Sequence, residues 1–539
     1  MGAHARRGGI WFDAAVWTVT AAVVMWVGLI ARQAPCRQHV YGQPINPFVR
    51  LCYSDIPLLY QGRGVATGAG IYSQVPLEYP VLTGYFIMAG RFLTRVFGGV
   101  VGPQASGQQQ LDASYRFFVI CAIGLFVCFL GTVLIHLAMG RGRRGGPAST
   151  VLPASTVLPA SERSWDAWMI ACAPVVLASG LINFDMLAVL LTSLGLWAWA
   201  RRRPMVSGAL IGLAFAAKFY PILLVPALLL VCLRADRMAQ FVRWLGAGVG
   251  AWLVVNLPVM VTAWQGWTAF WVTNRDRGAD LGSLWYVLSL MGFPVGPVTW
   301  VSLACMVLGA AAVTWVVLTA PRRPRLAQVA LLFLIVFLVF NKVYSPQYSL
   351  WLLPLVVLAR PKVRDWAIWN LVEVLYWAAV WGFLEGILGI GSGADVLYWL
   401  ATFARIGVQV WLALRVVDDI RYPWDDPVRT PFVDDPIGGV LDHAPDAAWM
   451  LRRPARPASS GADAGGSPSE TLEPQPASGA PPEGLVPYVP AEGPAPYVPV
   501  EEPAPADPPA DPESASSPPR RPRRAAEPAP DEPTWADWA

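Results

Sequence analysis

Charged residues are scarce in this 539-residue sequence: Asp, Glu, Lys and Arg together make up 14% of it, and hydrophobic residues make up 55%. Soluble domains carry roughly 25% charged residues, so the composition excludes an ordinary soluble protein. The sequence lacks a nucleotide-binding P-loop, which argues against an ATP-driven pump. It has only 4 His, and none is spaced with a Cys or an acid as zinc ligands are. The basic residues form short clusters between apolar runs, which argues against a nucleic-acid partner.

Repeated apolar runs of about 20 residues dominate the chain, and this is the length that crosses a membrane. Short basic clusters separate the runs, and such clusters mark the cytoplasmic side of membrane proteins. They lie at Arg6–Arg7, Arg141–Arg144, Arg201–Arg203, Arg234–Arg237, Arg322–Arg325 and Arg360–Arg364. If all are cytoplasmic, an even number of crossings separates consecutive clusters. The sequence therefore predicts an all-α polytopic membrane protein with about twelve transmembrane helices and both termini inside.

The predicted spans are 14–31, 116–138, 165–182, 185–201, 205–217, 220–233, 240–263, 294–319, 326–341, 347–360, 366–385 and 398–416. No small-residue cleavage site follows the first run, so it is interpreted as a span and not as a cleaved signal peptide. The pair 205–217 and 220–233 is short, and is interpreted either as two broken helices or as a re-entrant hairpin. Residues 79–97 do not fit the count, so we expect an amphipathic or re-entrant element on the outer face there.

This topology divides the chain into a cytoplasmic N-terminus (1–13), a membrane domain (14–421) and a cytoplasmic tail (422–539). Inside the membrane domain, residues 32–115 form a long first outer loop, and residues 141–164 form a cytoplasmic loop with the repeat PASTVLPASTVLPAS. The tail is rich in Pro, Ala, Glu, Asp and Ser, so it is predicted to be disordered. Two interpretations stay open for the tail: no specific role, or docking of a cytoplasmic partner through its Pro-Tyr repeats, its Arg520–Arg524 cluster or its final PTWADWA.

Polar side chains collect on the predicted outer side, where charges at membrane depth are costly and tend to be functional. They are Asp55, Glu78, Asp185, Lys218, Arg275, Asp276, Arg277, Asp280, Lys342 and Gln347. Three of them, Asp185, Lys218 and Lys342, directly adjoin apolar spans. We therefore expect a polar cavity at the outer ends of the helices. The alternative is that each is an ordinary loop charge in water.

Two of the 7 cysteines, Cys36 and Cys52, lie in the long first outer loop. An exported loop lies in an oxidising compartment, where a disulfide can form. Such a bond would brace the segment that carries Asp55. Two unpaired thiols are the equally weighted alternative. The other five cysteines lie in or beside spans and are interpreted as small core residues.

Four stretches carry a recognisable pattern: SDIPLLYQGRGVATGAGIYSQVPLEYPVLTGY, NFDMLAVLLTSLGLWAWARRRPMVSGALIGLAFAAKFYPILLVPALLL, RGADLGSLWY and NKVYSPQYSLWLLPL. In order and spacing they resemble bacterial glycosyltransferase family 87 (the DUF2029 type) in the GT-C superfamily of integral-membrane glycosyltransferases. The resemblance covers most of the membrane domain and implies a GT-C-like helical bundle. One departure is that the family's EYPP reads EYPV here. Glu78 is kept, but the turn after Pro80 is put in doubt.

The resemblance implies an enzyme that moves a sugar from a polyprenyl-phosphate donor to a lipid, glycan or protein acceptor at the outer face of the plasma membrane. Mannose is the implied sugar, as in the actinobacterial polyprenyl-phosphate-mannose-dependent α-mannosyltransferases. A carboxylate is needed to accept the proton of the acceptor hydroxyl, and cations are needed to stabilise the leaving phosphate. No cofactor and no obligatory metal are expected, although some GT-C enzymes use a divalent ion.

Individual roles follow from the same resemblance. Asp55 matches the general base that the superfamily places in its first outer loop, and Glu78 is the second catalytic candidate. The predicted donor-phosphate ligands are Arg275 and Arg277, whose guanidinium groups suit bidentate contacts, with Lys218 and Lys342 as helpers. The predicted sugar-binding residues are Asp185, Tyr79, Trp285, Tyr344 and Gln347. For each of these five, ordinary packing is the alternative.

Two other functions stay open at this point. A multi-pass transporter or lipid flippase also fits about twelve spans with intramembrane charges, but it predicts pseudo-symmetric halves, and no internal repeat is evident across the membrane part. The second alternative is a non-catalytic membrane scaffold whose tail recruits cytoplasmic partners. It predicts that Asp55→Asn leaves function intact and that loss of the tail abolishes it.

Overall fold

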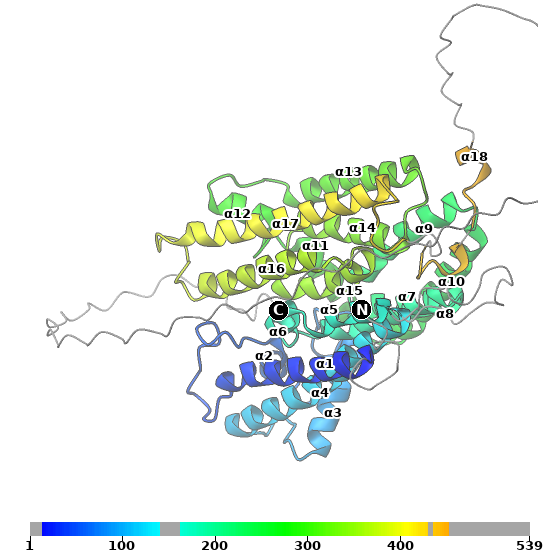
Figure 1. Ribbon diagram of the computed structural model, residues 1–539. Helices are drawn as coiled ribbons and strands as arrows, with labels where there is room; N and C mark the ends of the chain where they lie inside the picture. The colour runs from blue at the N-terminus through cyan, green and yellow to red at the C-terminus, as the bar shows by residue number, and fades with distance from the viewer. Residues whose placement is uncertain (1–12, 141–161, 430–434, 443, 452–539) are drawn as a thin grey trace, which may run out of the picture. The chain divides into compact units, whose positions relative to one another are not determined.

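The computed structural model describes residues 13–140, 162–429, 435–442 and 444–451, and Figure 1 draws them as coloured ribbon. Their regular structure is helical, apart from one isolated bridge between Ile71 and Val75. The predicted all-α class is confirmed. The basic residues at Arg6–Arg7 and Arg141–Arg144, the repeat PASTVLPASTVLPAS and the greater part of the tail lie outside the described residues.

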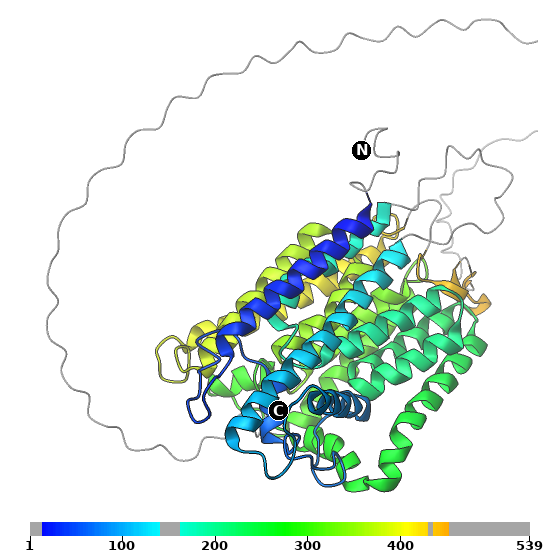
Figure 2. The same ribbon diagram turned by 90° about the horizontal axis from the view of Figure 1, so that it is seen from below.

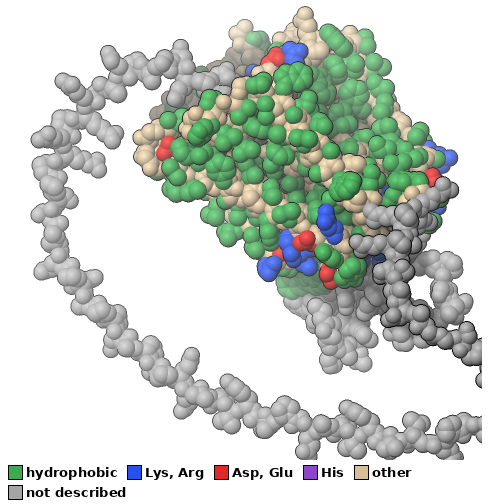
Figure 3. Space-filling model, turned by 90° about the horizontal axis from the view of Figure 1, so that it is seen from above, with side chains coloured by type: hydrophobic (Ala, Val, Ile, Leu, Met, Phe, Trp, Pro, Cys, Tyr) green, Lys and Arg blue, Asp and Glu red, His purple; other side chains and the backbone are tan. Residues whose placement is uncertain are grey.

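Six helices in the described part of the chain are long and apolar enough to cross a membrane. They are α1 (Ala14–Gln33), α4 (Gly107–Gly140), α10 (Met238–Thr262), α13 (Val298–Thr319), α16 (Val363–Leu384) and α17 (Asp395–Arg421). In the most apolar windows of α10 and α13, only 11% and 17% of the residues are buried. Figure 3 shows hydrophobic side chains over most of one face, with charged side chains toward its edges. Such a surface requires a lipid environment, so the prediction of a membrane-embedded protein is confirmed.

The other predicted spans fall on shorter apolar helices. These are α5 (Trp168–Ala171) with α6 (Pro174–Ser179), α7 (Asp185–Ala200), α8 (Pro204–Ala217), η5 (Tyr220–Leu223) with α9 (Leu224–Arg234), α14 (Leu326–Phe340), and η6 (Pro346–Tyr348) with α15 (Ser349–Ala359). A short 3-10 turn, η4 (Glu162–Ala167), precedes α5. Helices α14 and α15 are almost wholly buried, as expected of helices that are apolar on every side.

The shortness of these helices positions the site. Helix α8 has 14 residues, which at 1.5 Å per residue extend about 21 Å. The hydrocarbon core of a bilayer is about 30 Å thick, and the long helices exceed it. Where short helices end beside long ones, their connecting turns lie recessed from the membrane surface. The turns at 180–184, 218–219 and 341–345 lie at such ends.

One segment after α17 shows which helix ends share a side. Its contacts are Trp199 Nε1 to Gly438 O at 3.0 Å, Arg234 to Asp446 at 2.9 Å, Arg323 to Ala444 O at 2.7 Å, and Arg325 to Asp426 at 2.8 Å. The described basic clusters at the ends of α7, α9, α13 and α14 therefore lie together, as their common cytoplasmic placement predicts.

The beginning of the predicted tail is ordered. Asp426 is buried and accepts hydrogen bonds from Arg325 and Gln328, and η7 (Gly439–Leu441) packs on the end of α7. A last short helix is α18 (Ala448–Leu451). The disorder predicted from residue 422 onward is therefore wrong for the described residues up to 451. Composition missed this order because it arises from carboxylates that neutralise arginines buried at the helix ends.

The first outer loop contains three helical segments, η3 (Ala34–Cys36), α2 (Asp55–Gly62) and α3 (Val81–Val96). Helix α4 begins at Gly107, nine residues before the span predicted from residue 116, so the last part of this loop is helical. Helix α3 buries one face, with Val81, Gly84, Ile87, Gly90 and Thr94 spaced three or four apart. In Figure 2 it is seen end-on, across the direction of α1 and α4. This agrees with the amphipathic element expected for residues 79–97.

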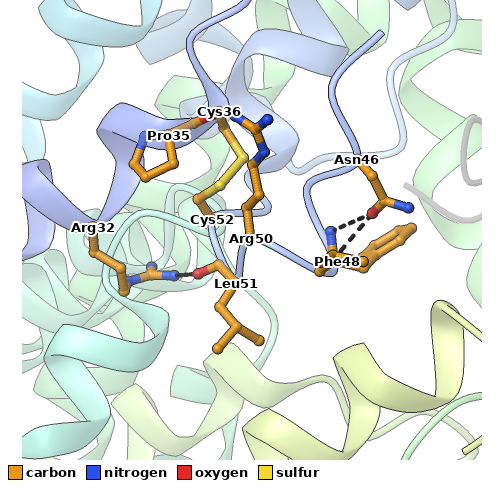
Figure 4. The surroundings of a disulfide bond; sticks show 9 residues. Arg32, Pro35, Cys36, Asn46, Phe48, Arg50, Leu51 and Cys52 are labelled. Carbon is orange, nitrogen blue, oxygen red and sulfur yellow. Dashed lines mark hydrogen bonds between the residues drawn. A yellow bond between two sulfur atoms is a disulfide. The ribbon is translucent and has the colours of Figure 1, made fainter. Parts of the chain in front are cut away.

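Cys36 and Cys52 are disulfide-bonded, which decides between the two interpretations that the sequence left open. Figure 4 shows this junction, where Arg32 at the end of α1 donates to the backbone carbonyl of Leu51. The chain just before Asp55 is therefore attached to the end of α1 by a covalent bond and a hydrogen bond.

The predicted second outer loop is also helical. It contains α11 (Trp264–Asp276), which follows α10 after a single residue, and α12 (Leu284–Leu290). The tryptophans Trp252, Trp267 and Trp271 of α10 and α11 contact one another, with ring centroids 6.2 to 6.4 Å apart. These contacts fix the direction in which α11 leaves α10.

Candidate active site

A cavity of about 390 Å³ lies at the helix ends opposite to those that carry the described basic clusters. Its lining includes eight of the eleven residues predicted for the site. They are Asp55, Glu78, Tyr79, Lys218, Arg275, Arg277, Lys342 and Gln347. Segments far apart in the sequence therefore converge on one hollow, as expected for the polar cavity. The ordinary-loop alternative does not describe the buried members of this set, which are Asp55, Tyr79, Lys342 and Gln347.

Asp55 occupies the start of α2. Ser54 caps the helix, its hydroxyl accepting from the backbone N–H of Ile56, and this hydroxyl also donates to Leu181 O at 2.6 Å. The backbone N–H of Asp55 donates to Ile182 O at 2.8 Å. The sequence Ser-Asp at a helix start is typical of an N-cap followed by an acid, which the helix dipole stabilises. These bonds hold Asp55 against the turn before α7.

The Asp55 carboxylate is buried and accepts two hydrogen bonds. Tyr53 Oη donates to Oδ1 at 2.6 Å, and Asn183 Nδ2 donates to Oδ2 at 3.0 Å. Burial raises the pKa of this carboxyl to about 6, against the lowering effect of the two hydrogen bonds and of the Lys218 charge. A carboxylate with a pKa near 6 is ionised at neutral pH and more basic than an exposed one, which suits a general base.

Asn183 joins Asp55 to Tyr79. Its Nδ2 also donates to Tyr79 Oη at 2.8 Å, and its Oδ1 accepts from the backbone N–H of Phe184 at 2.6 Å. Burial and the nearby Asp55 charge raise the pKa of Tyr79 well above its usual value, so its hydroxyl stays protonated. The turn before α7 thus orients two cavity side chains through one amide.

Asp185 lies behind the cavity lining. It is fully buried at the start of α7, its Oδ1 accepts from Trp351 Nε1 at 2.7 Å, and the same oxygen is 3.4 Å from Lys218 Nζ. Lys218 also lies over the ring of Tyr79, 5.2 Å from its centroid. Asp185 therefore does not line the cavity itself. It contacts Lys218 and Trp351, which do line it.

The two predicted phosphate-binding arginines lie at the end of α11. Arg275 is 72% exposed and pairs with Asp276 at 2.8 Å. Arg277 is 22% exposed and pairs with Asp280 at 2.9 Å. Exposed ion pairs exchange readily with other ligands, because they contribute little stability. The Arg275–Asp276 pair is of this kind, whereas the Arg277–Asp280 pair is largely buried, with the Asp280 side chain 7% exposed.

Lys342 lines the cavity but directs its ammonium group at backbone. Its Nζ donates to Arg277 O at 2.6 Å, Arg275 O at 3.0 Å and Asn274 O at 3.2 Å, and it lies 3.0 Å from Thr299 Oγ1. An ammonium has three N–H donors, so these partners fully occupy it. The group caps the carbonyl end of α11, where a cation is favoured by the helix dipole.

Glu78, the second catalytic candidate, is 22% exposed at the cavity wall. Its Oε1 is 3.1 Å from the NH2 group of Arg63, the residue that follows α2. This ion pair links the end of α2 to the segment before α3. Its geometry is that of a pair that orders the loop.

Two predicted sugar-binding residues, Trp285 and Tyr344, lie outside the cavity lining. Trp285 is buried and donates from Nε1 to Phe340 O at 2.9 Å. Tyr344 is 1% exposed, and the guanidinium of Arg405 lies 3.5 Å from its ring centroid. Both side chains support the turn after α14 from behind, which is the packing alternative named for them.

An ion pair that the sequence analysis missed fixes the same turn. Arg405 on α17 pairs with Glu373 on α16 at 2.8 Å, and both are buried. Arg405 also donates to Tyr344 O at 2.6 Å and Ser345 O at 3.1 Å. The turn that leads to Gln347 and to the cavity is therefore held through two backbone carbonyls.

Three further cavity residues, Tyr53, Asn183 and Tyr348, also escaped the sequence analysis. The sequence did contain a signal for Tyr53. It precedes Asp55 by two residues, and side chains two positions apart on an extended backbone point to the same side of the chain. Asn183 begins the quoted stretch NFDMLAVLL but was not singled out. Tyr348 stacks on Trp351 with centroids 3.8 Å apart, a contact that no sequence spacing identifies as part of a cavity.

One side of the cavity is apolar. Its lining there includes Phe270 and Trp271 of α11, Leu303 and Met306 of α13, and Phe337 of α14. Leu303 is 48% exposed on the outer surface of α13 as well. The polar cavity therefore continues into a wall that reaches the membrane-facing surface.

In the part of the chain that the structure describes, no group of three or more His, Cys, Asp or Glu is arranged to hold a metal ion. The expectations about metal and cofactor therefore remain predictions.

The fold and the cavity define a polytopic membrane protein with a recessed polar site. The sequence model described as "Glycosyltransferase family 87" matches residues 108–341. This match confirms the resemblance seen in the motifs: over these residues the chain is similar to glycosyltransferase family 87.

Comparison with other proteins adds little. No curated protein matches the chain. Among solved structures it is similar to the archaeal oligosaccharyltransferase AglB from Archaeoglobus fulgidus, in complex with an inhibitory peptide and a dolichol-phosphate. The similarity has a TM-score of 0.33 and 12% sequence identity, and it covers 74% of this chain and 56% of that one. A likeness at this level carries no argument about this chain.

Proposed function

We propose that this glycosyltransferase moves a mannose from a polyprenyl-phosphate donor to a hydroxyl of a lipid, glycan or protein acceptor at the outer face of the plasma membrane. The acceptor oxygen forms a bond to the anomeric carbon, and the bond from that carbon to the phosphate oxygen breaks. Its electron pair leaves with the polyprenyl phosphate, and the acceptor proton passes to a carboxylate. The observation that carries the proposal is the buried Asp55 carboxylate in the same cavity as Lys218 and Arg277.

Asp55 is the proposed general base. Its pKa of about 6 leaves it ionised at neutral pH. Tyr53 and Asn183 orient both carboxylate oxygens. A positioned base of this kind contributes about 10²–10⁴-fold to a rate. Glu78 keeps the loop-ordering role described above.

Arg277 and Arg275 are the proposed phosphate ligands, with Lys218 as a second source of positive charge. Guanidinium groups bind phosphate oxygens bidentately, as they bind carboxylates. Lys342 contributes by holding the end of α11 on which both arginines lie. Tyr79 and Gln347 are proposed to contact the sugar, and Asp185 to keep Lys218 in place.

The lipid part of the donor is proposed to lie along the apolar wall formed by α11, α13 and α14. An outer location of the reaction is supported by two observations. The cavity lies opposite the described basic clusters, which favour the cytoplasm. The disulfide between Cys36 and Cys52, close to Asp55, is of a kind that persists in oxidising compartments.

The test is transfer of radiolabelled mannose from polyprenyl-phosphate-mannose in membranes that contain the wild type, Asp55→Asn or Asp112→Asn. We expect Asp55→Asn to lose about 10²-fold or more of the rate. Asp112 is a suitable control, because it lies on α4 outside the cavity and only accepts a hydrogen bond from Gln108. Transfer unchanged in Asp55→Asn would refute the base assignment. No transfer by the wild type would refute the donor and sugar.

A further inference from the structure

A second hollow of about 140 Å³ adjoins the chain next to Asp55. Tyr53 lines both hollows, whereas Ser54 lines only the second pocket and Asp55 lines only the cavity. The backbone of Ser54 is extended, with φ −151° and ψ 131°, and successive side chains of extended backbone point to opposite sides. The segment 53–55 is therefore a partition between the cavity and the pocket.

The pocket owes its existence to the early start of α4. Its lining includes Leu111, Ser114 and Tyr115, which lie in the stretch predicted as loop but form the first turns of that helix. The opposite wall comes from α2 and from the residues around the disulfide. A helix and a disulfide-braced loop make a preformed site, which lowers the entropy cost of binding.

The polar groups of the pocket are mainly uncharged. They come from Gln33, Gln38, Gln61, Ser54, Ser114 and Tyr115, and the lining contains no acid and a single cation, Arg37. Amides and hydroxyls both donate and accept hydrogen bonds, as sugar hydroxyls do. The Arg37 guanidinium lies over the Tyr115 ring, 4.2 Å from its centroid. This stacking orients the ring as a flat wall, and flat aromatic faces suit the C–H faces of sugar rings.

The size of the pocket fits one sugar ring. The pocket volume is about 140 Å³. At about 10–15 Å³ of cavity volume per water molecule, the pocket has room for roughly ten waters. A phosphate group is a poorer match, because one stacked guanidinium would have to neutralise it alone.

We propose that this pocket binds a neutral sugar unit of the acceptor, on the opposite side of the segment 53–55 from the donor. The inference rests on the proposed function and adds a second carbohydrate site to it. An acceptor held there lies next to the segment that carries the base. Its reacting end then has to reach Asp55 past the side chain of Tyr53, the residue common to both hollows.

The test is direct binding, so that it does not depend on turnover. The probes are the methyl α-glycosides of mannose, glucose and galactose, measured by saturation-transfer NMR on the full-length protein in lipid nanodiscs. We expect saturable binding of at least one glycoside that persists in Asp55→Asn. Tyr115→Leu and Arg37→Ala should each weaken it about fivefold or more, through loss of the stacked wall. Arg116→Ala is the matched control, because Arg116 is the exposed neighbour of Tyr115 and donates only to Phe97 O.

Two results would overturn the inference. One is that no glycoside binds. The other is that binding is weakened by Arg277→Ala in the cavity and is unaffected by Tyr115→Leu and Arg37→Ala. Circular dichroism of each variant checks that the helices are intact. Because binding is read without transfer, failure of the proposed donor chemistry leaves this result interpretable.

Discussion

The hydroxyl of Tyr53 donates a hydrogen bond to Asp55 at 2.6 Å, although the two residues are separated by only one position in the chain. The Tyr53 ring contacts Phe48 and Trp381, with centroid distances of 5.4 and 4.9 Å, and these two rings also contact each other at 5.8 Å. Trp381 belongs to α16, far away in the sequence. The orientation of the proposed base therefore depends on an aromatic contact between the first outer loop and a late helix.

Removal of this hydroxyl should shift the pH dependence of transfer. The bond stabilises the ionised carboxylate, so Tyr53→Phe should raise the pKa of Asp55 above about 6. A general base works when it is deprotonated, so the acid limb of kcat/KM should move upward by about one pH unit. The other charged or titratable groups that act on Asp55 or Tyr79 are Lys218, Asp185 and Glu78, and they are unchanged in this variant. Tyr60→Phe is the control, because the Tyr60 hydroxyl is buried without a hydrogen-bond partner. An unshifted limb in Tyr53→Phe would contradict the role of the bond.

Lys342→Met should uncouple α11 from the cavity wall. The substitution removes an ammonium that donates to three carbonyls at the end of this helix. Because Arg275 and Arg277 lie on that end, we expect KM for the donor to rise about tenfold, a free-energy change of about 1.4 kcal/mol. Lys362→Met is the matched control, since Lys362 precedes α16 at the opposite end of the helices. If KM for the donor is the same in both variants, Lys342 does not position the arginines.

Loss of the disulfide should destabilise the first outer loop. The bond closes a loop of 16 residues, and cross-links of this length contribute about 3 kcal/mol in the chain-entropy model. We expect Cys36→Ser, Cys52→Ser and the double variant to show a similar lowering of the thermal midpoint and a loss of transfer. The double variant is the control for effects of a single free thiol. Unchanged midpoint and transfer in all three would show that the other contacts of the loop suffice.

Asp426→Asn should destabilise the end of the bundle that carries the described basic clusters. It leaves Arg325, 1% exposed, without its bidentate carboxylate partner. Breaking a buried pair from one side costs about 3–5 kcal/mol. Asp418→Asn breaks a comparable pair with Arg415 on the exposed surface of α17, where the cost is about 0–1 kcal/mol. The check is the thermal midpoint in detergent, and equal midpoints for the two variants would contradict a structural role of the segment after α17.

The cavity shows how far sequence analysis reached. Lys218 and Lys342 were identified because charges beside apolar runs are conspicuous, and Asp55 because it matches the base position of the resembled superfamily; the positive-inside rule predicted that all three share a side. Trp285 and Tyr344 were misplaced because an aromatic residue near a motif has the same sequence signal whether it faces a cavity or packs behind it. Asn183 was passed over because an amide in a turn is common, and its two hydrogen bonds to Asp55 and Tyr79 join distant segments.

The sequence by itself determined the helical class, the membrane environment and the resemblance to a glycosyltransferase family, since these follow from composition, from the length of apolar runs and from local motifs. It also determined that the polar residues share a side, because basic clusters fix the direction of each crossing. Only the tertiary structure decided that α8, α14 and α15 end short of the long helices and so enclose a recessed cavity. It also decided that Asp426 pairs with Arg325, 101 residues away. Such pairings depend on which helix ends meet in space, and burial turns an ordinary tail carboxylate into part of the fold.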